Sequence, residues 1–504
     1  MHMTLEKFIR ATRKAVWPFS VSLLLFFLLF AAIFATSNPL CCADDASIAV
    51  VSKNLASGLG YLSTVNYWGS DLDYNGVLFD PGISTGVTSV LPVAIGIYLF
   101  GPFAPVPGLV HIALYSLLFA ALVSKIRAIS GGVVAGGILA LFVCFIASTS
   151  AYHFEHWYAQ LGEVLAAMLV ILGAAVLGMS SPGYRAYFVA GLLMGGAVLT
   201  KQLAVLYVVG AYLVVLFGFL RAPRSERVFK FQLSLVFFIG VCAPILFFEL
   251  WKIWVLGLGG WLENWQKFYQ FLLQNGVGQK KQYDSVSQLL LVRLNTVHQR
   301  FFVSPYALSL ALISYPFLLV SLPIHLRRFS VFLLFGFVLH VVYWMGLSIG
   351  LPRYVYIAVI VGGLLLSIAQ VAGKGRACRI LMGLSIVMVI FSGLPKINWQ
   401  FPMNARIDGN ARSAQIVASY IELKHQRESV HTQWWAHSAA LEYLSSMPHR
   451  YSNWNEPRNR LVSNRLVITD SRFLHNDDAN FMAFLADSCS IELAYGVYTI
   501  FSCR

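Results

Sequence analysis

Charged residues are scarce in this sequence. Only 12% of its 504 residues are Asp, Glu, Lys or Arg, and 58% are hydrophobic, whereas soluble globular chains carry roughly 25% charged residues. This scarcity excludes a soluble fold and predicts that lipid solvates much of the surface. The formal net charge of +14 could suit a nucleic acid. Positive charge in short loops between apolar runs is instead typical of membrane topology, so we expect no nucleic-acid partner.

Several other signatures are missing from the sequence. It has no tandem repeat, no low-complexity segment and no metal-like C-x-x-C pair among its seven cysteines. Cys489 and Cys503 bracket a short hairpin-like stretch and could form a disulfide if this part of the chain lies outside the cytoplasm. No A-x-A-like cleavage site follows the first apolar run, from about Val16 to Thr36, which is longer than a signal peptide requires. We therefore expect a retained first helix with its N-terminus in the cytoplasm.

Long apolar runs are what the sequence has in abundance. Beyond the first, they lie at about 105–124, 131–150, 162–179, 186–220, 231–250, 302–323, 330–349, 354–371 and 380–395. The run 186–220 is long enough for two short helices, broken near Lys201 and Gln202. Since about 20 apolar residues cross a bilayer, the pattern predicts about eleven spans, an odd number that places the C-terminus outside.

Basic residues fix the predicted orientation of the spans. All the basic clusters become cytoplasmic if the apolar stretch 82–101 does not cross the membrane. The clusters comprise Lys125, Arg127, Arg185, Arg221, Arg224, Arg227, Lys230, Arg327, Arg328, Lys374, Arg376 and Arg379. The segments that then face outward are 38–101, 151–161 and 251–301.

The tail has a different pattern from the apolar body. Stretches 413–426 and 436–446 look helical, and 465–469 and 490–501 look like strands. We predict a mostly α protein, with a polytopic transmembrane helical bundle over residues 1–396. A small periplasmic α/β domain is predicted over residues 397–504.

A short acidic motif follows the first span. From Asp44 the chain reads DDASIAVVSKNLASGLGY, and 82–101 reads GISTGVTSVLPVAIGIYLFG. These segments resemble the first external loop of the GT-C membrane glycosyltransferases that use polyprenyl-phosphate sugars. This superfamily includes enzymes like protein mannosyltransferases, lipid A aminoarabinose transferase and O-antigen glucosyltransferases. The shared features are acids after the first span, A-x-I, N-L-A-x-G-x-G and an apolar helix that ends L-F-G. The resemblance covers about the first two hundred residues well, and the later spans only in layout.

The resemblance implies roles for several acids. In the family the acid after the first span is the base that takes the acceptor's proton, a role that falls here on Asp44 or Asp45. A second external acid follows the third span, where SAYHFEHWYAQLGE offers Glu155 and Glu163. A carboxylate in a helix first turn also explains Glu163 without any catalytic role.

The histidines of the same loop add two further interpretations. No cofactor is required by these patterns, although His153 and His156 with Glu155 could bind a divalent cation. A simple polar loop explains these three residues as well. His153, His156 and the distant Trp434 could also contact the acceptor or its sugar, and core packing is the alternative for Trp434.

Three residues are candidates for binding the donor phosphate. Lys201 lies in an L-T-K sequence that resembles the family, and Arg353 with Tyr354 resembles its R-Y signature. A lysine between apolar runs is expensive unless it faces a cavity, an anion or the interface, and an arginine offers a fork for phosphate oxygens. The alternative is that Lys201 and Arg353 extend to the outer headgroups.

The family resemblance predicts a bacterial inner-membrane enzyme. It would transfer a sugar, with inversion, from a polyprenyl-phosphate donor to a periplasmic acceptor such as lipopolysaccharide, O-antigen, lipid A or another envelope glycan. The predicted partners are this donor, an envelope glycan or lipid acceptor, and membrane lipid. The alternatives are an O-antigen polymerase or ligase acting on lipid-linked oligosaccharide, and a transporter of lipid-linked sugars.

Overall fold

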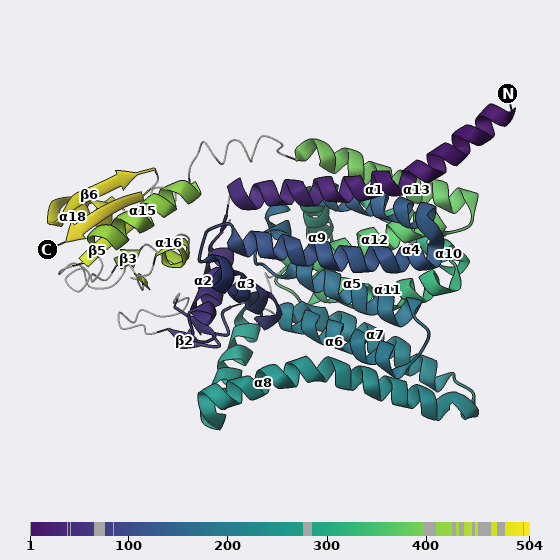
Figure 1. Ribbon diagram of the computed structural model, residues 1–504, viewed down its shortest axis with the longest axis horizontal. Coiled ribbons are helices and arrows are strands. Elements are labelled where there is room, and N and C mark those ends of the chain that lie inside the picture. The colour runs from purple at the N-terminus through teal and green to yellow at the C-terminus, as the bar shows by residue number, and fades with distance from the viewer. Residues whose placement is uncertain are drawn as a thin grey trace.

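The computed structural model describes residues 2–37, 39–40, 42–64, 76–83, 85–275, 285–397, 410–425, 430–432, 438–445, 449–451, 465–470, 479–496 and 498–503. Long helices run roughly side by side in one body, and a small sheet with its helices lies beyond one end of that body (Figure 1). Two short helices, α2 and α3, lie between these two parts (Figure 1).

The helical body contains long apolar helices. They are α1 (His2–Ser37), α4 (Val106–Thr149), α5 (Glu163–Met179), α6 (Tyr184–Thr200), α7 (Val205–Leu220), α8 (Arg224–Asn275), α10 (Pro305–Ser321), α11 (Ile324–Gly346), α12 (Tyr356–Ala372) and α13 (Arg376–Gly393). Among the described residues, 7 helices are long and apolar enough to cross a membrane, or 8 if a bent pair counts as one span. Helices α5 and α6 are also apolar but have only 17 residues each.

Helix α4 is a hairpin of two spans. Its 44 residues include Gly131, whose backbone has a φ of 78° and leaves the helical region. The rings of Phe119 and Phe142 have centroids 6.2 Å apart, whereas 23 residues of straight helix would separate them by about 35 Å. The halves before and after Gly131 therefore run antiparallel. With both halves counted, α1, α4 to α7, the first part of α8 and α10 to α13 supply eleven apolar segments, which confirms the predicted polytopic bundle.

The segments between spans form short structures at one end of the bundle. They are α2 (Ala43–Ala56), β1 (Leu62–Ser63), β2 (Val77–Leu78), α3 (Val87–Phe100), α9 (Val286–Phe301) and the short helices η1 (Phe154–Trp157), η2 (Gln202–Ala204), η3 (Pro352–Val355) and η4 (Leu394–Lys396). Helix α3 has 14 residues, about 21 Å of helix, which is shorter than the roughly 30 Å of bilayer hydrocarbon. Helix α9 is bent by 99° from α10, so it runs across the direction of that span.

The tail forms a mixed sheet covered by helices. Its elements are α15 (Asn410–Lys424), β3 (Val430–Thr432), α16 (Ser438–Leu444), β4 (His449–Tyr451), β5 (Arg465–Asp470), α18 (Ala479–Ser488), β6 (Cys489–Tyr495) and β7 (Tyr498–Cys503). The strand order is β4-β3-β5-β7-β6, with β4, β3 and β5 parallel and β7 antiparallel to both neighbours.

Alternate residues of β5 face opposite sides of this sheet. Leu466 and Ile468 pack in a cluster with α15, while Val467 packs with α18. The sequence predicts a hairpin-like stretch between Cys489 and Cys503. The structure places two strands there, β6 and β7, separated by a turn at Gly496, whose φ is +60°.

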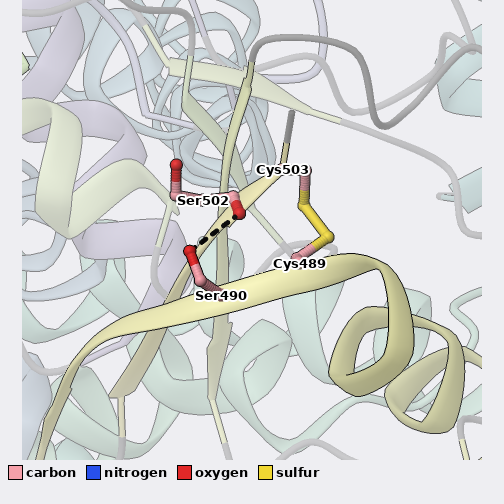
Figure 2. The surroundings of a disulfide bond; sticks show 4 residues. All are labelled: Cys489, Ser490, Ser502 and Cys503. Carbon is pink, nitrogen blue, oxygen red and sulfur yellow. Dashed lines mark hydrogen bonds between the residues drawn. A yellow bond between two sulfur atoms is a disulfide. The ribbon is translucent and has the colours of Figure 1, made fainter.

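A disulfide joins the two strands of this final hairpin at the end opposite its turn. Cys489 and Cys503 face each other across β6 and β7 with Cα atoms 4.3 Å apart, and their sulfur atoms are bonded (Figure 2). The next pair along the ladder is joined by the Ser490 hydroxyl, which donates to the Ser502 carbonyl (Figure 2).

The tail is docked on the membrane body through α2. Helix α16 packs Ala440 and Tyr443 against Ala46, Ala49 and Val50 of α2. The Lys53 ammonium donates to the carbonyl oxygens of Glu442 and Ser445, near the end of α16, and the Thr64 hydroxyl donates to the Glu442 carboxylate. The helix that begins with the acidic motif is therefore held by the tail.

Candidate active site

The two adjacent acids have different surroundings. Both lie in the first turn of α2, where the helix dipole favours negative charge. The Asp44 carboxylate pairs with the Arg353 guanidinium. The Asp45 carboxylate accepts a hydrogen bond of 2.7 Å from the backbone N–H of Gln160. Asp45 is only 2% exposed, whereas the Asp44 side chain is 18% exposed, so Asp44 is the more accessible acid.

Glu163 and Lys201 form a buried ion pair. Glu163 begins α5, and Lys201 lies at the break between α6 and η2. The Lys201 Nζ atom is 3.0 Å from the Glu163 Oε1 atom and donates to the Leu161 carbonyl at 2.9 Å. Both side chains are at most 5% exposed. Since an unpaired buried charge is costly, each side chain stabilises the other. The lysine at the expected helix break is therefore paired with a carboxylate.

Arg353 lies in a short helix that directly precedes α12. It lies in η3, and its guanidinium carbon is 5.5 Å from the centre of the Tyr354 ring. The Tyr354 carbonyl accepts a hydrogen bond of 2.6 Å from the Nε2 atom of His340. Among the described residues, the Arg353 Nε atom is buried without a hydrogen-bond partner. The guanidinium has five donors, so its donors can serve Asp44 or another anion.

The loop between α4 and α5 places His153, Glu155 and His156 together. The His153 Nδ1 atom is 3.6 Å from the Glu155 Oε1 atom, and the His156 Nδ1 atom is 3.4 Å from the Glu163 Oε2 atom. Burial opposes ionisation of Glu155, but the hydrogen bond from His153 and the nearby His156 outweigh it and lower the pKa of Glu155. His156 is 4% exposed and lies against Tyr356, so it offers little surface to an acceptor.

The predicted residues come from distant parts of the chain but largely meet in one place. Asp44 contacts Arg353, Glu163 contacts both Lys201 and His156, and Glu163 also acts electrostatically on Arg353. Trp434 lies outside the described residues. The arrangement offers a partly exposed carboxylate beside two cations at one end of a membrane bundle.

Two supporting groups were not anticipated from the sequence. Gln160 holds Asp45 through its backbone, and its side-chain amide donates to Ser52 of α2 at 2.8 Å. Ser52 lies seven residues after Asp45, on the same helix face. This spacing is the sequence feature from which a shared partner of Asp45 and Ser52 could have been predicted. The Tyr356 hydroxyl also bonds Ser150 and accepts from the Trp157 indole N–H. These bonds fix the loop that carries the histidines.

Solved structures similar to this chain include ArnT from Cupriavidus metallidurans. For ArnT bound to undecaprenyl phosphate the TM-score is 0.66 at 11% identity, and the match covers 96% of this chain and 98% of that one. For ArnT in the apo state the TM-score is 0.59 at 12% identity, with the same coverage of both chains. The oligosaccharyltransferase AglB from Archaeoglobus fulgidus, in complex with an inhibitory peptide and a dolichol-phosphate, has a TM-score of 0.49 at 11% identity. Its match covers 90% of this chain and 69% of that one. No protein-family model and no curated protein sequence matches the chain.

Proposed function

Because the chain has the GT-C fold of ArnT, we propose that it is a glycosyltransferase that takes a sugar from a polyprenyl-phosphate donor. The acceptor is a hydroxyl or amine of an envelope glycan or lipid, such as lipopolysaccharide, O-antigen or lipid A. ArnT itself binds undecaprenyl phosphate, a lipid phosphate of the proposed donor class. Fold similarity alone does not assign an activity, so the proposal depends on the site.

The observation that carries the proposal is the pairing of Asp44 with Arg353 beside the pair of Glu163 with Lys201. Transfer from a lipid phosphate requires a base for the acceptor proton and cations for the departing phosphate. Asp44 is the partly exposed acid, so it is assigned as the base. Arg353, with an Nε atom unpartnered among the described residues, is assigned to the donor phosphate, together with Lys201.

The proposed reaction is a single displacement. Asp44 removes a proton from the acceptor, whose oxygen or nitrogen attacks the anomeric carbon from the face opposite the phosphate. The bond between that carbon and the phosphate oxygen breaks, and its electron pair leaves on polyprenyl phosphate, where Arg353 and Lys201 stabilise the negative charge. Attack from the opposite face inverts the anomeric configuration. Asp45 acts as a positioning residue because its carboxylate is engaged with Gln160.

The proposed location is a bacterial inner membrane with the site on the periplasmic side. Helices α7 and α12 begin beside the site and end in basic loops, which carry Arg221 after α7 and Lys374 after α12. The positive-inside rule supports a cytoplasmic location for that end of the bundle. The disulfide of Cys489 and Cys503 supports the same orientation for the tail.

Sugar transfer by purified protein is the direct test. Wild type, Asp44→Asn and Asp45→Asn are compared with radiolabelled polyprenyl-phosphate sugars, and donor binding is measured alongside. We expect Asp44→Asn to lose transfer by at least about 100-fold while it keeps donor binding, since general-base catalysis contributes roughly 10²–10⁴-fold.

The matched variant Asp45→Asn is expected to keep much of its transfer, because an amide oxygen can still accept from the Gln160 N–H. Full activity in Asp44→Asn would remove the assigned base. Transport of the lipid-linked sugar without transfer, or joining of whole oligosaccharides, would replace the proposal by one of the alternative functions.

A further inference from the structure

We propose that His153, Glu155 and His156 form a binding site for a divalent transition-metal ion. The three side chains lie on the loop between α4 and α5, in and next to η1. Each offers one ligand atom, and these atoms lie within 4.8 Å of one another. Three nitrogen and oxygen ligands at 2.0–2.2 Å from one ion lie about 3.3–3.8 Å apart, so the side chains would move together by up to about 1.5 Å when an ion binds.

A polar atom of the cluster has no hydrogen-bond partner among the described residues. His153 packs on Phe301 with ring centroids 5.3 Å apart. Among the described residues, its Nε2 atom is buried without a hydrogen-bond partner. Polar atoms buried in this way are uncommon in folded proteins, and an ion would satisfy one here. The Glu155 carboxylate lies beside His153, with its Oε1 atom 3.6 Å from the His153 Nδ1 atom.

Glu163 occupies the position of a supporting group. Its Oε2 atom is 3.4 Å from the Nδ1 atom of His156, and its Oε1 atom is 3.0 Å from Lys201. Metal-binding histidines commonly present their second nitrogen to a carboxylate, which fixes the ring orientation. The His156 ring is held on its other side by Tyr356, with centroids 4.6 Å apart, so it is oriented before any ion binds.

The ligand set selects the class of metal. Two imidazoles and one carboxylate suit Zn²⁺, Mn²⁺, Fe²⁺ or Co²⁺, whereas Mg²⁺ and Ca²⁺ prefer oxygen ligands. If the proposed function is correct, an ion here adds positive charge near Lys201, where the departing phosphate is stabilised. The binding proposal itself needs neither donor nor acceptor.

Metal binding is therefore measured on the full chain in lipid nanodiscs, without substrate and with any affinity tag removed. After chelator treatment, Zn²⁺ and Mg²⁺ are titrated by calorimetry, and Co²⁺ is followed by its visible absorption. We expect one Zn²⁺ per chain, bound at least 100-fold more tightly than Mg²⁺. His153→Ala and Glu155→Gln are expected to weaken Zn²⁺ binding at least 10-fold and to change the Co²⁺ spectrum.

His325→Ala is the matched control, because His325 is an exposed histidine at the start of α11. It is expected to bind Zn²⁺ as wild type does, and all variants are compared for equal thermal unfolding without metal. Equal Zn²⁺ binding by wild type, His153→Ala and Glu155→Gln would overturn the proposal, as would equal affinity for Mg²⁺ and Zn²⁺. Because no transfer is measured, a failure here leaves the proposed glycosyltransferase activity untouched.

Discussion

The residues at the centre of the site are constrained by burial as much as by chemistry. Glu163 and Lys201 are both nearly inaccessible and lie 3.0 Å apart at their charged atoms. Removing one partner of such a pair leaves the other charge buried without compensation, which typically costs about 3–5 kcal/mol. Stability and the proposed activity therefore depend on the same two side chains, and a single substitution cannot separate the two effects.

A double substitution can separate them. Lys201→Met is expected to lower the thermal unfolding midpoint strongly, because Glu163 keeps its charge without a partner. Adding Glu163→Gln is expected to recover most of that midpoint, since it removes the orphaned charge. Sugar transfer is expected to stay low in both proteins, because the phosphate has lost a cation. Thermal unfolding in detergent and the transfer assay provide the two readings, and recovery of transfer in the double variant would contradict the role of Lys201.

At the scale of the element, α4 shows how one residue divides a long apolar stretch. The sequence alone places two apolar runs on either side of residues 125–130, and the structure reverses the chain at Gly131. A φ of 78° with a ψ of 163° lies in a region open essentially to glycine, and other residues there cost about 1–3 kcal/mol. The hairpin brings Phe119 against Phe142 and helps to bury the first three spans together.

Gly131→Ala is expected to destabilise the protein by about 1–3 kcal/mol because of this backbone conformation. Gly132→Ala is a close control, since Gly132 has an ordinary φ and its added Cβ would meet only Trp17 at 4.0 Å. That neighbour substitution is expected to be neutral or stabilising by up to about 1 kcal/mol, as alanine favours helices. Denaturant unfolding of both variants checks the difference, and equal effects would show that the reversal does not depend on glycine.

At the scale of the whole molecule, the membrane body and the tail are joined by a buried polar contact between α2 and α16. Burial raises the pKa of Glu442 to about 8, against the opposing effect of Lys53. Burial also lowers the pKa of Lys53, which Glu442 and Glu422 partly offset. Both groups are therefore shifted toward their neutral forms, and the contact depends on pH.

Raising the pH is expected to weaken this docking. A carboxyl with a raised pKa contributes stability that is fully present below its unfolded pKa, near 4.5, and is lost as the pH rises through about 8. Lys53 contributes in the opposite direction, but only above its own lowered pKa. Hydrogen-exchange protection of residues 438–445, corrected for intrinsic rates, is expected to fall between pH 5.5 and 8.5 in wild type. Glu442→Gln removes the titrating carboxyl, so a similar fall in that variant would contradict the assignment.

Much of the membrane body could be predicted from the sequence, because an apolar span is recognised from the hydropathy of about 20 consecutive residues. The break at Lys201, the eleven apolar segments and the position of Glu163 at a helix start all follow from short windows. The contacts that depend on distant residues could not be predicted. Nothing near Lys53 indicates Glu442, which lies 389 residues away, and Gln160 looks like an ordinary loop residue until Asp45 is placed beside it. The sequence also left Asp44 and Asp45 equivalent, and only their different partners distinguish them.

The pair of Arg353 and Asp44 has a consequence for how an anion enters the site. Arg353 is already partly removed from water, since Asp44 occupies one side of its guanidinium. In the proposed reaction, an incoming phosphate would exchange one anionic partner of Arg353 for another, and most of the cost of dehydrating the cation would have been met during folding. The same exchange would release the Asp44 carboxylate as the phosphate arrives. On this proposal the site would work as an ion exchanger, in which the displaced carboxylate stays tethered and becomes the base.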